Sequence, residues 1–237
     1  MTAEEKKQIK NKFDLNLEEM AKAGLHFGHR ASKLNPQMKP YLYGVKKTVH
    51  IIDLEKTKEK FEQALNFIKE LTEQNKILLF VGTKPEHKDL VEQLAQECQL
   101  CYVTGRWLGG TLTNFKVIRQ RVKYLQDLEQ KKQSPDFEQY TKKERFDMEK
   151  EIQGLKEKFE GIRSMEQLPD AVFVCSLRKD DLAIKESTMK EIPAIAICDT
   201  NANPTLVDYP IPANDDANSS VKYILEKVKE VILRNKK

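Results

Sequence analysis

Basic side chains are gathered in two stretches of this 237-residue sequence that contain no acidic residue. One stretch lies between Met20 and Ile52, and the other runs from Cys98 to Gln126. Because 33% of all residues are charged, with 41 basic against 37 acidic ones, such stretches depart from the overall composition. One-sided local charge favours an anionic partner over an ordinary solvated face.

Aromatic residues are interleaved with the cations of the first stretch, where Tyr41 and Tyr43 lie among lysines. Cations can bind phosphates and rings can stack on bases, so this combination suits a nucleic-acid surface. We predict that both stretches lie on one flank of the molecule, against one polyanion. The residues expected to contact phosphates are Arg30, Lys33, Lys39, Lys46, Lys47, Arg106, Lys116, Arg119 and Lys123.

Three histidines offer a weaker alternative, a metal site. His26 and His29 are three residues apart and His50 follows, but no cysteine or carboxylate lies close to the first two in the sequence. In a basic loop, phosphate contacts are favoured over metal binding. We therefore expect no metal and no cofactor.

The four cysteines are expected to be reduced and structural. Cys98 and Cys101 have the spacing of metal and redox sites, but no second Cys/His pair completes a zinc signature. A redox pair is usually placed where a helix begins, whereas Cys98 falls near the predicted end of one. With Cys175 and Cys198, the set fits a reducing compartment.

A different class of function, a small-ligand or nucleotide-binding enzyme, would use polar residues after apolar runs. Asp53, Lys84, Asp199 and Asn201 stand at such positions, and parallel sheets bind ligands outside the carboxyl ends of their strands. However, the sequence has no phosphate loop, no dinucleotide fingerprint and no distinctive nucleophile signature. Catalysis is poorly supported.

Short apolar runs alternate with helical patterns along most of the chain. Strands are predicted at residues 49–52, 77–81, 101–103, 171–175, 194–198 and 207–209, and helices at 17–23, 54–73, from 85, 181–190 and through 221–232. Continuous apolar strands separated by helices indicate a parallel sheet covered on both faces.

Residues 106–115 begin a segment that does not follow this alternation of strands and helices. Trp107 and the pair Gly109-Gly110 predict a tight turn over a buried ring, after which Thr113 is expected to cap a helix. Residues 113–161 then carry two helical stripes joined near residues 134–136, the second opening with a capping box at Thr141. This pattern predicts an antiparallel coiled-coil hairpin inserted into a sheet domain of residues 1–112 and 162–237.

Composition excludes some classes of protein. No stretch approaches the ~20 apolar residues of a membrane span, and residues 1–12 lack the apolar segment of a secretory signal. The net charge is only +4, so the basic character is local.

Several of these segments, in this order, closely resemble the universal S-two family of small-subunit ribosomal proteins in its bacterial form. The matching stretches are residues 23–29 (AGLHFGH), 35–41 (NPQMKPY), 49–57 (VHIIDLEKT), 80–84 (FVGTK), 106–115 (RWLGGTLTNF), 168–171 (LPDA), 199–201 (DTN) and 211–217 (IPANDDA). Together they extend over nearly the whole chain, from about residue 17 to 233.

The resemblance implies a flavodoxin-like, doubly wound parallel sheet with an inserted antiparallel coiled-coil hairpin and no catalysis. It implies contacts with small-subunit ribosomal RNA and neighbouring ribosomal proteins, including recruitment of the S-one protein that handles messenger RNA. A cytoplasmic place in the bacterial ribosome is expected, with a plastid or mitochondrial ribosome as the alternative, and neither membrane association nor a homo-oligomer. A free-standing adaptor whose hairpin binds protein is a third hypothesis.

Overall fold

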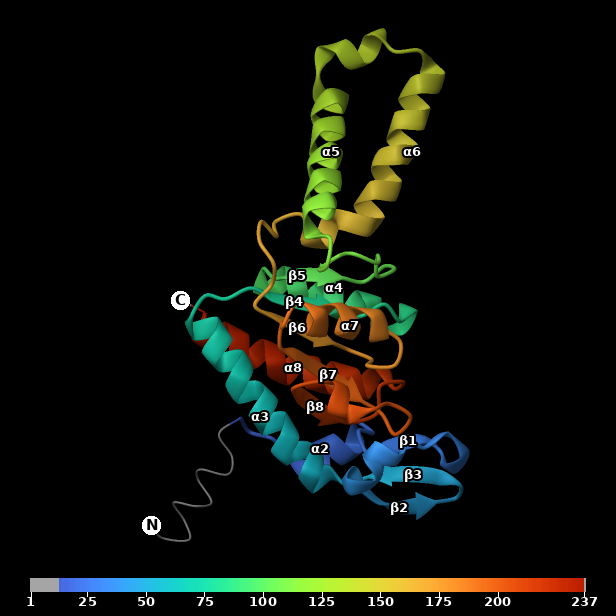
Figure 1. Cartoon of the computed structure of the whole chain (residues 1–237), viewed down its shortest axis with the longest axis vertical. Coiled ribbons are helices and arrows are strands. Elements are labelled where there is room, and N and C mark those ends of the chain that lie inside the picture. Colours follow the sequence, from blue (N-terminus) through green and yellow to red (C-terminus); the bar gives the residue numbers. More distant parts are fainter. Residues whose placement is uncertain (1–12, 237) are drawn as a thin grey trace.

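A computed structural model describes residues 13–236, so residues 1–12 and 237 of the predicted sheet domain lie outside the described part. Its centre is a five-stranded parallel sheet of β4 (Leu78–Val81), β5 (Cys101–Val103), β6 (Ala171–Val174), β7 (Ala194–Cys198) and β8 (Tyr209–Pro212). The strand order is β5-β4-β6-β7-β8 (Figure 1). This is the flavodoxin-like order, in which the chain first adds a strand on one side of β4 and then returns to add three on the other.

Both faces of the sheet are buried, as the continuous apolar strands require. Strands β4, β6 and β7 are buried along their whole length. Successive side chains point to opposite faces, so Phe80 and Phe173 enter one core cluster while Leu79 and Val172 enter the other. The sheet therefore separates two apolar cores.

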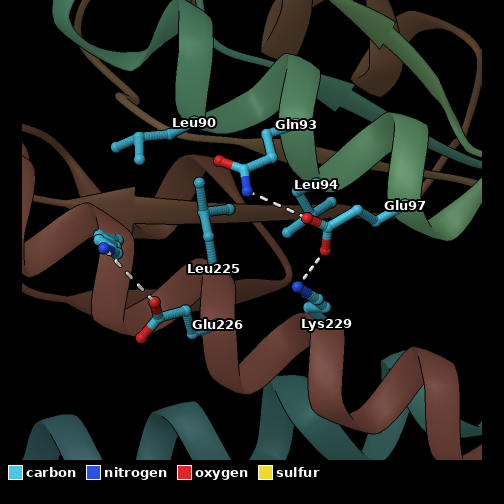
Figure 2. A pocket seen from close by; sticks show the side chains of 8 residues that line it. Leu90, Gln93, Leu94, Glu97, Leu225, Glu226 and Lys229 are labelled. Carbon is cyan, nitrogen blue, oxygen red and sulfur yellow. Dashed lines mark hydrogen bonds and ion pairs between the residues drawn. The ribbon is translucent and has the colours of Figure 1, made fainter.

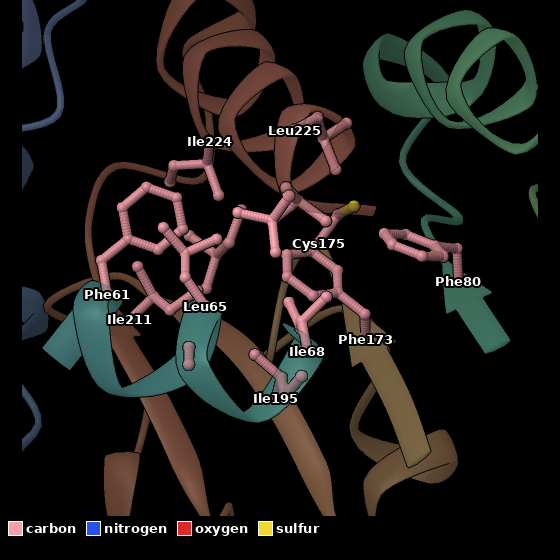
Figure 3. Close-up of a cluster of buried hydrophobic side chains, with 14 of the residues drawn as sticks. Phe61, Leu65, Ile68, Phe80, Phe173, Cys175, Ile195, Ile211, Ile224 and Leu225 are labelled. Carbon is pink, nitrogen blue, oxygen red and sulfur yellow. The ribbon is translucent and has the colours of Figure 1, made fainter. Parts of the chain in front are cut away.

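The first core lies between the sheet and helices α3 (Leu54–Glu73), α4 (Pro85–Cys98) and α8 (Asn218–Asn235). Figure 3 shows side chains of α3 (Phe61, Leu65 and Ile68) and of α8 (Ile224 and Leu225) gathered around Phe173 and Ile195 of the strands. Full burial of each such side chain contributes about 1.5–3 kcal/mol. The short helix α2 (Leu17–Lys22), capped by Asn16, adds Met20 to this core.

The second core lies under α7 (Asp181–Met189) and the base of two long helices, α5 (Phe115–Gln133) and α6 (Lys142–Phe159). Short 3-10 helices lie between these elements, at Ala31–Lys33 (η1), Pro36–Tyr41 (η2), Pro135–Gln139 (η3), Glu160–Ile162 (η4) and Pro204–Leu206 (η5). Within residues 13–236, no helix is long and apolar enough to cross a membrane.

One predicted strand lies outside the parallel sheet. Residues Val49–Ile52 form β3, the middle strand of a separate antiparallel sheet with β1 (Phe27–Arg30) and β2 (Leu42–Lys46). The prediction was wrong because this run alternates between half-buried and buried residues, which is typical of a sheet with one solvated face. Lys47 and Thr48 both have positive φ, 48° and 67°, in the two-residue turn that joins β2 to β3.

The last predicted strand is displaced along the chain. Strand β8 spans Tyr209–Pro212 rather than residues 207–209, and it holds two prolines. Because proline cannot donate to a ladder, it is confined to edge strands, and β8 is the edge of the parallel sheet.

Helices α5 and α6 run antiparallel and project away from the sheet (Figure 1). Toward the sheet they bury Ile118, Val122, Leu125 and Leu128 of α5 and Ile152 and Phe159 of α6. The predicted capping box is present at Thr141 and Glu144. Farther out, Lys132 pairs with Glu149 at 2.8 Å and Phe146 is 65% exposed, so the apolar seam is concentrated near the base.

Two glycines of this region should respond in opposite ways to alanine. A Cβ at Gly161 would lie 2.2 Å from the carbonyl oxygen of Tyr102, whereas a Cβ at Gly154, inside α6, would meet nothing within 4 Å. We expect Gly161→Ala to destabilise by about 1–3 kcal/mol through overpacking, and Gly154→Ala to stabilise by about 0.5–1 kcal/mol. Urea unfolding of both variants checks this, and equal effects would contradict the close approach at the hairpin base.

Candidate nucleic-acid interface

The loop that carries Arg106 is folded around one buried carboxylate. Glu186 of α7 is 4% exposed. It accepts hydrogen bonds from the Trp107 indole N–H at 3.1 Å and from the backbone N–H groups of Gly110 at 2.8 Å and Leu112 at 2.9 Å. Thr113 donates to it twice, through its backbone N–H and its hydroxyl, each at 3.1 Å. The tryptophan and the glycine pair are therefore parts of a carboxylate-binding turn.

This arrangement corrects the predicted role of Thr113. The hydroxyl of Thr113 bonds to Glu186 rather than to the start of a helix. Helix α5 begins at Phe115, and Asn114 precedes it without a side-chain capping bond. Gly110 has φ +92°, and a Cβ there would lie 3.2 Å from that of Asn114, which explains why the turn uses glycine.

Glu186 is charged at neutral pH, although it is buried. Burial raises its pKa, but the N–H donors of Thr113, Leu112, Trp107 and Gly110 outweigh that effect, so its pKa lies below the usual value. The carboxylate is held by donors of the protein itself. The sequence analysis did not identify Glu186, because it lies 73 positions from Thr113. The one available sign of a buried carboxylate was a glutamate close to the residues Ala183, Ile184 and Ser187, which α7 buries.

The second basic stretch forms what we call the hairpin group: Arg106, Lys116, Arg119 and Lys123. Lys116, Arg119 and Lys123 are spaced three and four residues apart on α5, so they share one face of the helix. Arg119 is half-buried and the other three are exposed. Among the described residues none of the four forms an ion pair with an acidic side chain.

The position of Lys116 on α5 is unfavourable for the helix itself. The first turn of α5 carries Lys116 and no acidic residue, whereas the first turns of α3, α4, α6 and α7 each carry one. Cations near a helix N-terminus oppose the helix dipole, at a typical cost of about 0.3–1 kcal/mol. Helix stability does not account for Lys116 at this position.

The first basic stretch forms the small-sheet group: Arg30, Lys33, Lys39, Lys46 and Lys47. Arg30 ends β1, Lys33 and Lys39 lie in 3-10 turns, and Lys46 and Lys47 lie at the β2–β3 turn. All five are exposed, and none is ion-paired within residues 13–236. Tyr43, on β2 between them, is 83% exposed, so its ring is free to stack.

The two groups do not form a single patch. The small antiparallel sheet lies beyond the β8 side of the parallel sheet, and α5 rises from the β5 side (Figure 1). Four strand spacings of ~4.8 Å separate these edges, roughly 19 Å. The predicted common flank is therefore divided into two regions.

Between the two groups lies a network of paired charges. Lys84 contacts Asp215 at 2.9 Å and Asp216 at 2.8 Å. The imidazole Nδ1 of His29 is 3.0 Å from Asp199, and its Nε2 is 3.4 Å from Asp216. The hydrogen bond to Asp199 raises the pKa of His29, against the effect of burial.

This network occupies the residues on which the enzyme alternative depended. Lys84 is held in an ion pair with Asp215, and Asp199 lies 3.0 Å from His29 Nδ1. Asn201 lies 2.8 Å from His29 Nε2, and Asp53 is elsewhere, capping α3. The small sheet also covers the end of β7, since a Cβ at Gly28 would lie 2.4 Å from Thr200 Cγ2. The crevice that a ligand would need at β7 is filled by protein.

The same network bears on the metal-site alternative, because it contains one of the three histidines. His29, Asp199 and Asp216 place candidate ligand atoms within 4.8 Å of one another, and His26 and His50 do not join them in the described part of the chain. Lys84 lies beside this group with its ammonium on Asp216, so a protein cation already compensates that carboxylate.

The four cysteines are free and buried. Cys98 is the last residue of α4 and Cys101 begins β5. Burial raises the pKa of the Cys98 and Cys101 thiols, which disfavours the reactive thiolate.

A small hollow lies between α4 and α8. Its volume is about 130 Å³, and Figure 2 shows that Leu94 and Leu225 line it. Glu97 is bonded to Gln93 on the same helix and pairs with Lys229 across the gap. These contacts make it part of the packing between the two helices.

His87, on α4 beside the network, predicts an acid-sensitive fold. It is fully buried, and burial together with the nearby Lys84 charge lowers its pKa from 6.5 to about 4. Between these two pH values, His87 is protonated in the unfolded chain but not in the folded chain. The free energy of unfolding therefore falls as the pH drops from about 6.5 to 4, by roughly 3 kcal/mol.

Urea unfolding at several pH values in this interval checks the His87 prediction. The free energy of unfolding of a His87→Leu variant should depend less on pH than that of the parent protein, whatever its value at pH 7. Parallel curves for the two proteins would show that His87 titrates normally.

Comparison with known proteins supports the motif resemblance. The family described as Ribosomal protein S2 matches residues 20–235. The chain is 41% identical over 220 residues to the small ribosomal subunit protein uS2 of Dictyoglomus thermophilum, covering 93% of this chain and 89% of that protein. It is 44% identical over 218 residues to the uS2c protein of Rhodomonas salina (92% and 90%), and 38% identical over 222 residues to the uS2 protein of a Nitratiruptor species (94% and 83%). The chain belongs to the ribosomal protein S2 family.

Proposed function

We propose that this chain is a structural constituent of the small ribosomal subunit and has no catalytic activity. The observation that carries the proposal is the match to a ribosomal family along residues 20–235, together with relatives named as small-subunit proteins at about 40% identity. The filled crevice at β7 is consistent with a scaffold rather than an enzyme. The relatives are of bacterial and plastid type, so the chain acts in a ribosome of one of these types.

Its RNA contacts are proposed to be electrostatic. The nine cations of the small-sheet and hairpin groups are solvent-accessible and unpaired among the described residues, although other lysines of this chain, such as Lys69, Lys185 and Lys222, have acidic partners. Contacts with phosphates position a protein on RNA without reading its sequence. Ribosomal RNA of the small subunit is the proposed ligand.

The projecting helices are proposed to be a distinct unit, residues 113–161, inserted between the two parts of the sheet domain, 1–112 and 162–237. The packing of α5 on α6 at the base supports a coiled-coil hairpin there. Glu129 of α5 binds both Lys156 at 2.8 Å and Arg163 at 2.7 Å, which fixes the second arm against the first. A surface of mixed charge suits neighbouring ribosomal proteins, and we include the S-one protein among the proposed partners because the family resemblance implies it.

Sedimentation tests this function. The full chain is mixed with small ribosomal subunits that lack their S-two protein and is run through a sucrose gradient at physiological salt. We expect it to migrate with the subunits, and a hairpin-deleted chain provides a second sample. A protein that remains at the top of the gradient would favour the adaptor hypothesis over a ribosomal role.

A further inference from the structure

A hollow of about 470 Å³ opens at the carboxyl ends of β4 and β5, next to the loop that follows β6. Its walls include Thr83 after β4, Thr104 after β5 and Trp107. We call it the switch-point hollow, because β4 is the strand from which the chain builds in both directions. In open parallel sheets this is the place where ligands bind, and unlike the end of β7 it is not covered by the small sheet.

Three cations from separate parts of the sequence line the hollow: Lys88 from the first turns of α4, Arg106 from the β5 loop and Lys179 from the loop before α7. All three are exposed. Within residues 13–236 none is paired with a carboxylate, although Lys185, in the helix that follows Lys179, is paired with Asp181 at 2.7 Å. The fold thus brings together three cations that the sequence keeps 18 and 73 positions apart.

One acidic residue, Asp180, also lines the hollow, but its carboxylate is buried and bonded to Thr83. Asp180 is 2% exposed and accepts from Thr83 twice, from the hydroxyl at 2.5 Å and from the backbone N–H at 3.4 Å. Burial raises its pKa, against these bonds and the nearby Lys179 charge. Among the residues that line the hollow, three exposed cations therefore face one buried carboxylate. Glu92 and Glu186 are bonded to the wall residues Thr104 and Trp107 but do not line the hollow themselves.

The shape of the hollow selects among anionic ligands. Trp107 is 6% exposed and its N–H is bound to Glu186, so the ring forms a wall and cannot swing out to stack on a base. The first turns of α4 and α7 contribute Pro85 and Leu182 to the lining, and their helix dipoles add to the positive field. Recognition in this hollow is therefore directed at charge and not at a base.

We propose that the switch-point hollow seats a phosphodiester of the RNA that the chain binds, held between Lys88, Arg106 and Lys179. This inference rests on the proposed function, and it adds Lys88 and Lys179 to the RNA-binding surface. The hollow adjoins the hairpin group through Arg106, so the RNA backbone continues from α5 onto the end of the sheet. Free inorganic phosphate or a mononucleotide offers the same chemistry, and the experiment separates these sources.

The test measures binding of the full chain to protein-free small-subunit ribosomal RNA as a function of salt. The test variant is Lys88→Gln with Lys179→Gln. The matched control is Lys76→Gln with Lys190→Gln. These two lysines are exposed, precede β4 and β7 at the amino ends of the strands, opposite to the hollow, and are unpaired within the described range. Both variants lose two positive charges, so a net-charge effect would appear in both.

We expect the test variant to bind RNA at least about tenfold more weakly near 100 mM salt, with a log–log salt slope lower by roughly 2. The control should keep both values. If the parent protein binds RNA and the test variant is indistinguishable from the control, the hollow proposal is overturned and the proposed function stands. If the parent protein does not bind this RNA, the hollow proposal and the proposed electrostatic RNA contacts are overturned, and sedimentation with the subunits decides the proposed function separately.

The second arm titrates the parent protein with inorganic phosphate and with AMP while the fluorescence of Trp107, the only tryptophan, is recorded. A phosphodiester site that depends on the RNA around it should give no saturation below about 1 mM. Saturation at micromolar AMP would identify a mononucleotide site and overturn the proposal.

Discussion

Replacing Glu186 with alanine is expected to lower the free energy of unfolding by at least about 3 kcal/mol. The variant leaves buried or half-buried donors of Trp107, Gly110, Leu112 and Thr113 without an acceptor, and each unsatisfied buried donor costs about 1–3 kcal/mol. A stable domain has a reserve of only about 5–15 kcal/mol. The loop that carries Arg106 and leads into α5 should lose its fixed shape first.

Urea unfolding and the melting temperature measure this effect, and for a chain of this length we expect the melting temperature to fall by at least about 6–12 °C. Glu226→Ala is the control, because it removes the same charge from an exposed position on α8 that is paired with Lys222, and it should change stability by less than about 0.5 kcal/mol. Equal losses in the two variants would mean that the carboxylate does not organise the loop.

The pH dependence gives an independent reading of Glu186. Its folded pKa lies below the ordinary value of 4.5, so its contribution is present above about pH 4.5 and is lost as the pH falls through the lowered folded pKa. His87 acts earlier, below about pH 6.5. A Glu186→Gln variant, whose amide N–H₂ faces backbone donors, should be less stable at neutral pH and approach the parent protein in strong acid.

The sequence was sufficient to predict the core of the fold. Apolar runs such as residues 171–175 could only be strands buried on both faces, and the helices between them required parallel connections. The run at residues 49–52 was harder, because periodicity within four residues does not identify the partner strand. Its membership of a separate antiparallel sheet depends on the Lys47-Thr48 turn. Both residues of this turn have positive φ, but neither is the glycine or asparagine by which such a turn is usually recognised in a sequence.

The candidate interface was predictable in kind but not in geometry. The absence of acids from two stretches could be read directly, and it identified nine cations that the structure leaves unpaired in the described chain. What could not be read is which distant residues join them. Lys179 and Glu186 meet the Arg106 loop only through the packing of α7 against the sheet, and such long-range contacts carry no local signal.

Because the nine cations form two separate groups, neutralising each group should weaken RNA binding independently. With six to nine phosphate contacts, binding by the parent protein should fall by about 10³–10⁵ between roughly 50 and 200 mM salt. Changing Arg106, Lys116, Arg119 and Lys123 to glutamine should lower the salt slope by roughly 3 to 4, and changing the five small-sheet residues should lower it by roughly 4 to 5. Filter binding to small-subunit ribosomal RNA gives both slopes.

The control removes four charges that already have partners, by changing Lys69, Lys132, Lys185 and Lys222 to glutamine. Its net charge falls from +4 to about zero, as in the hairpin-group variant. If net charge alone drove binding, the two variants would bind equally, and the assignment of the hairpin group would fail. If instead the groups act as separate sites on opposite sides of the parallel sheet, the logarithmic losses of the two group variants should add when they are combined. A combined loss no greater than that of one group would show that a single region carries the RNA and that the other region faces something else.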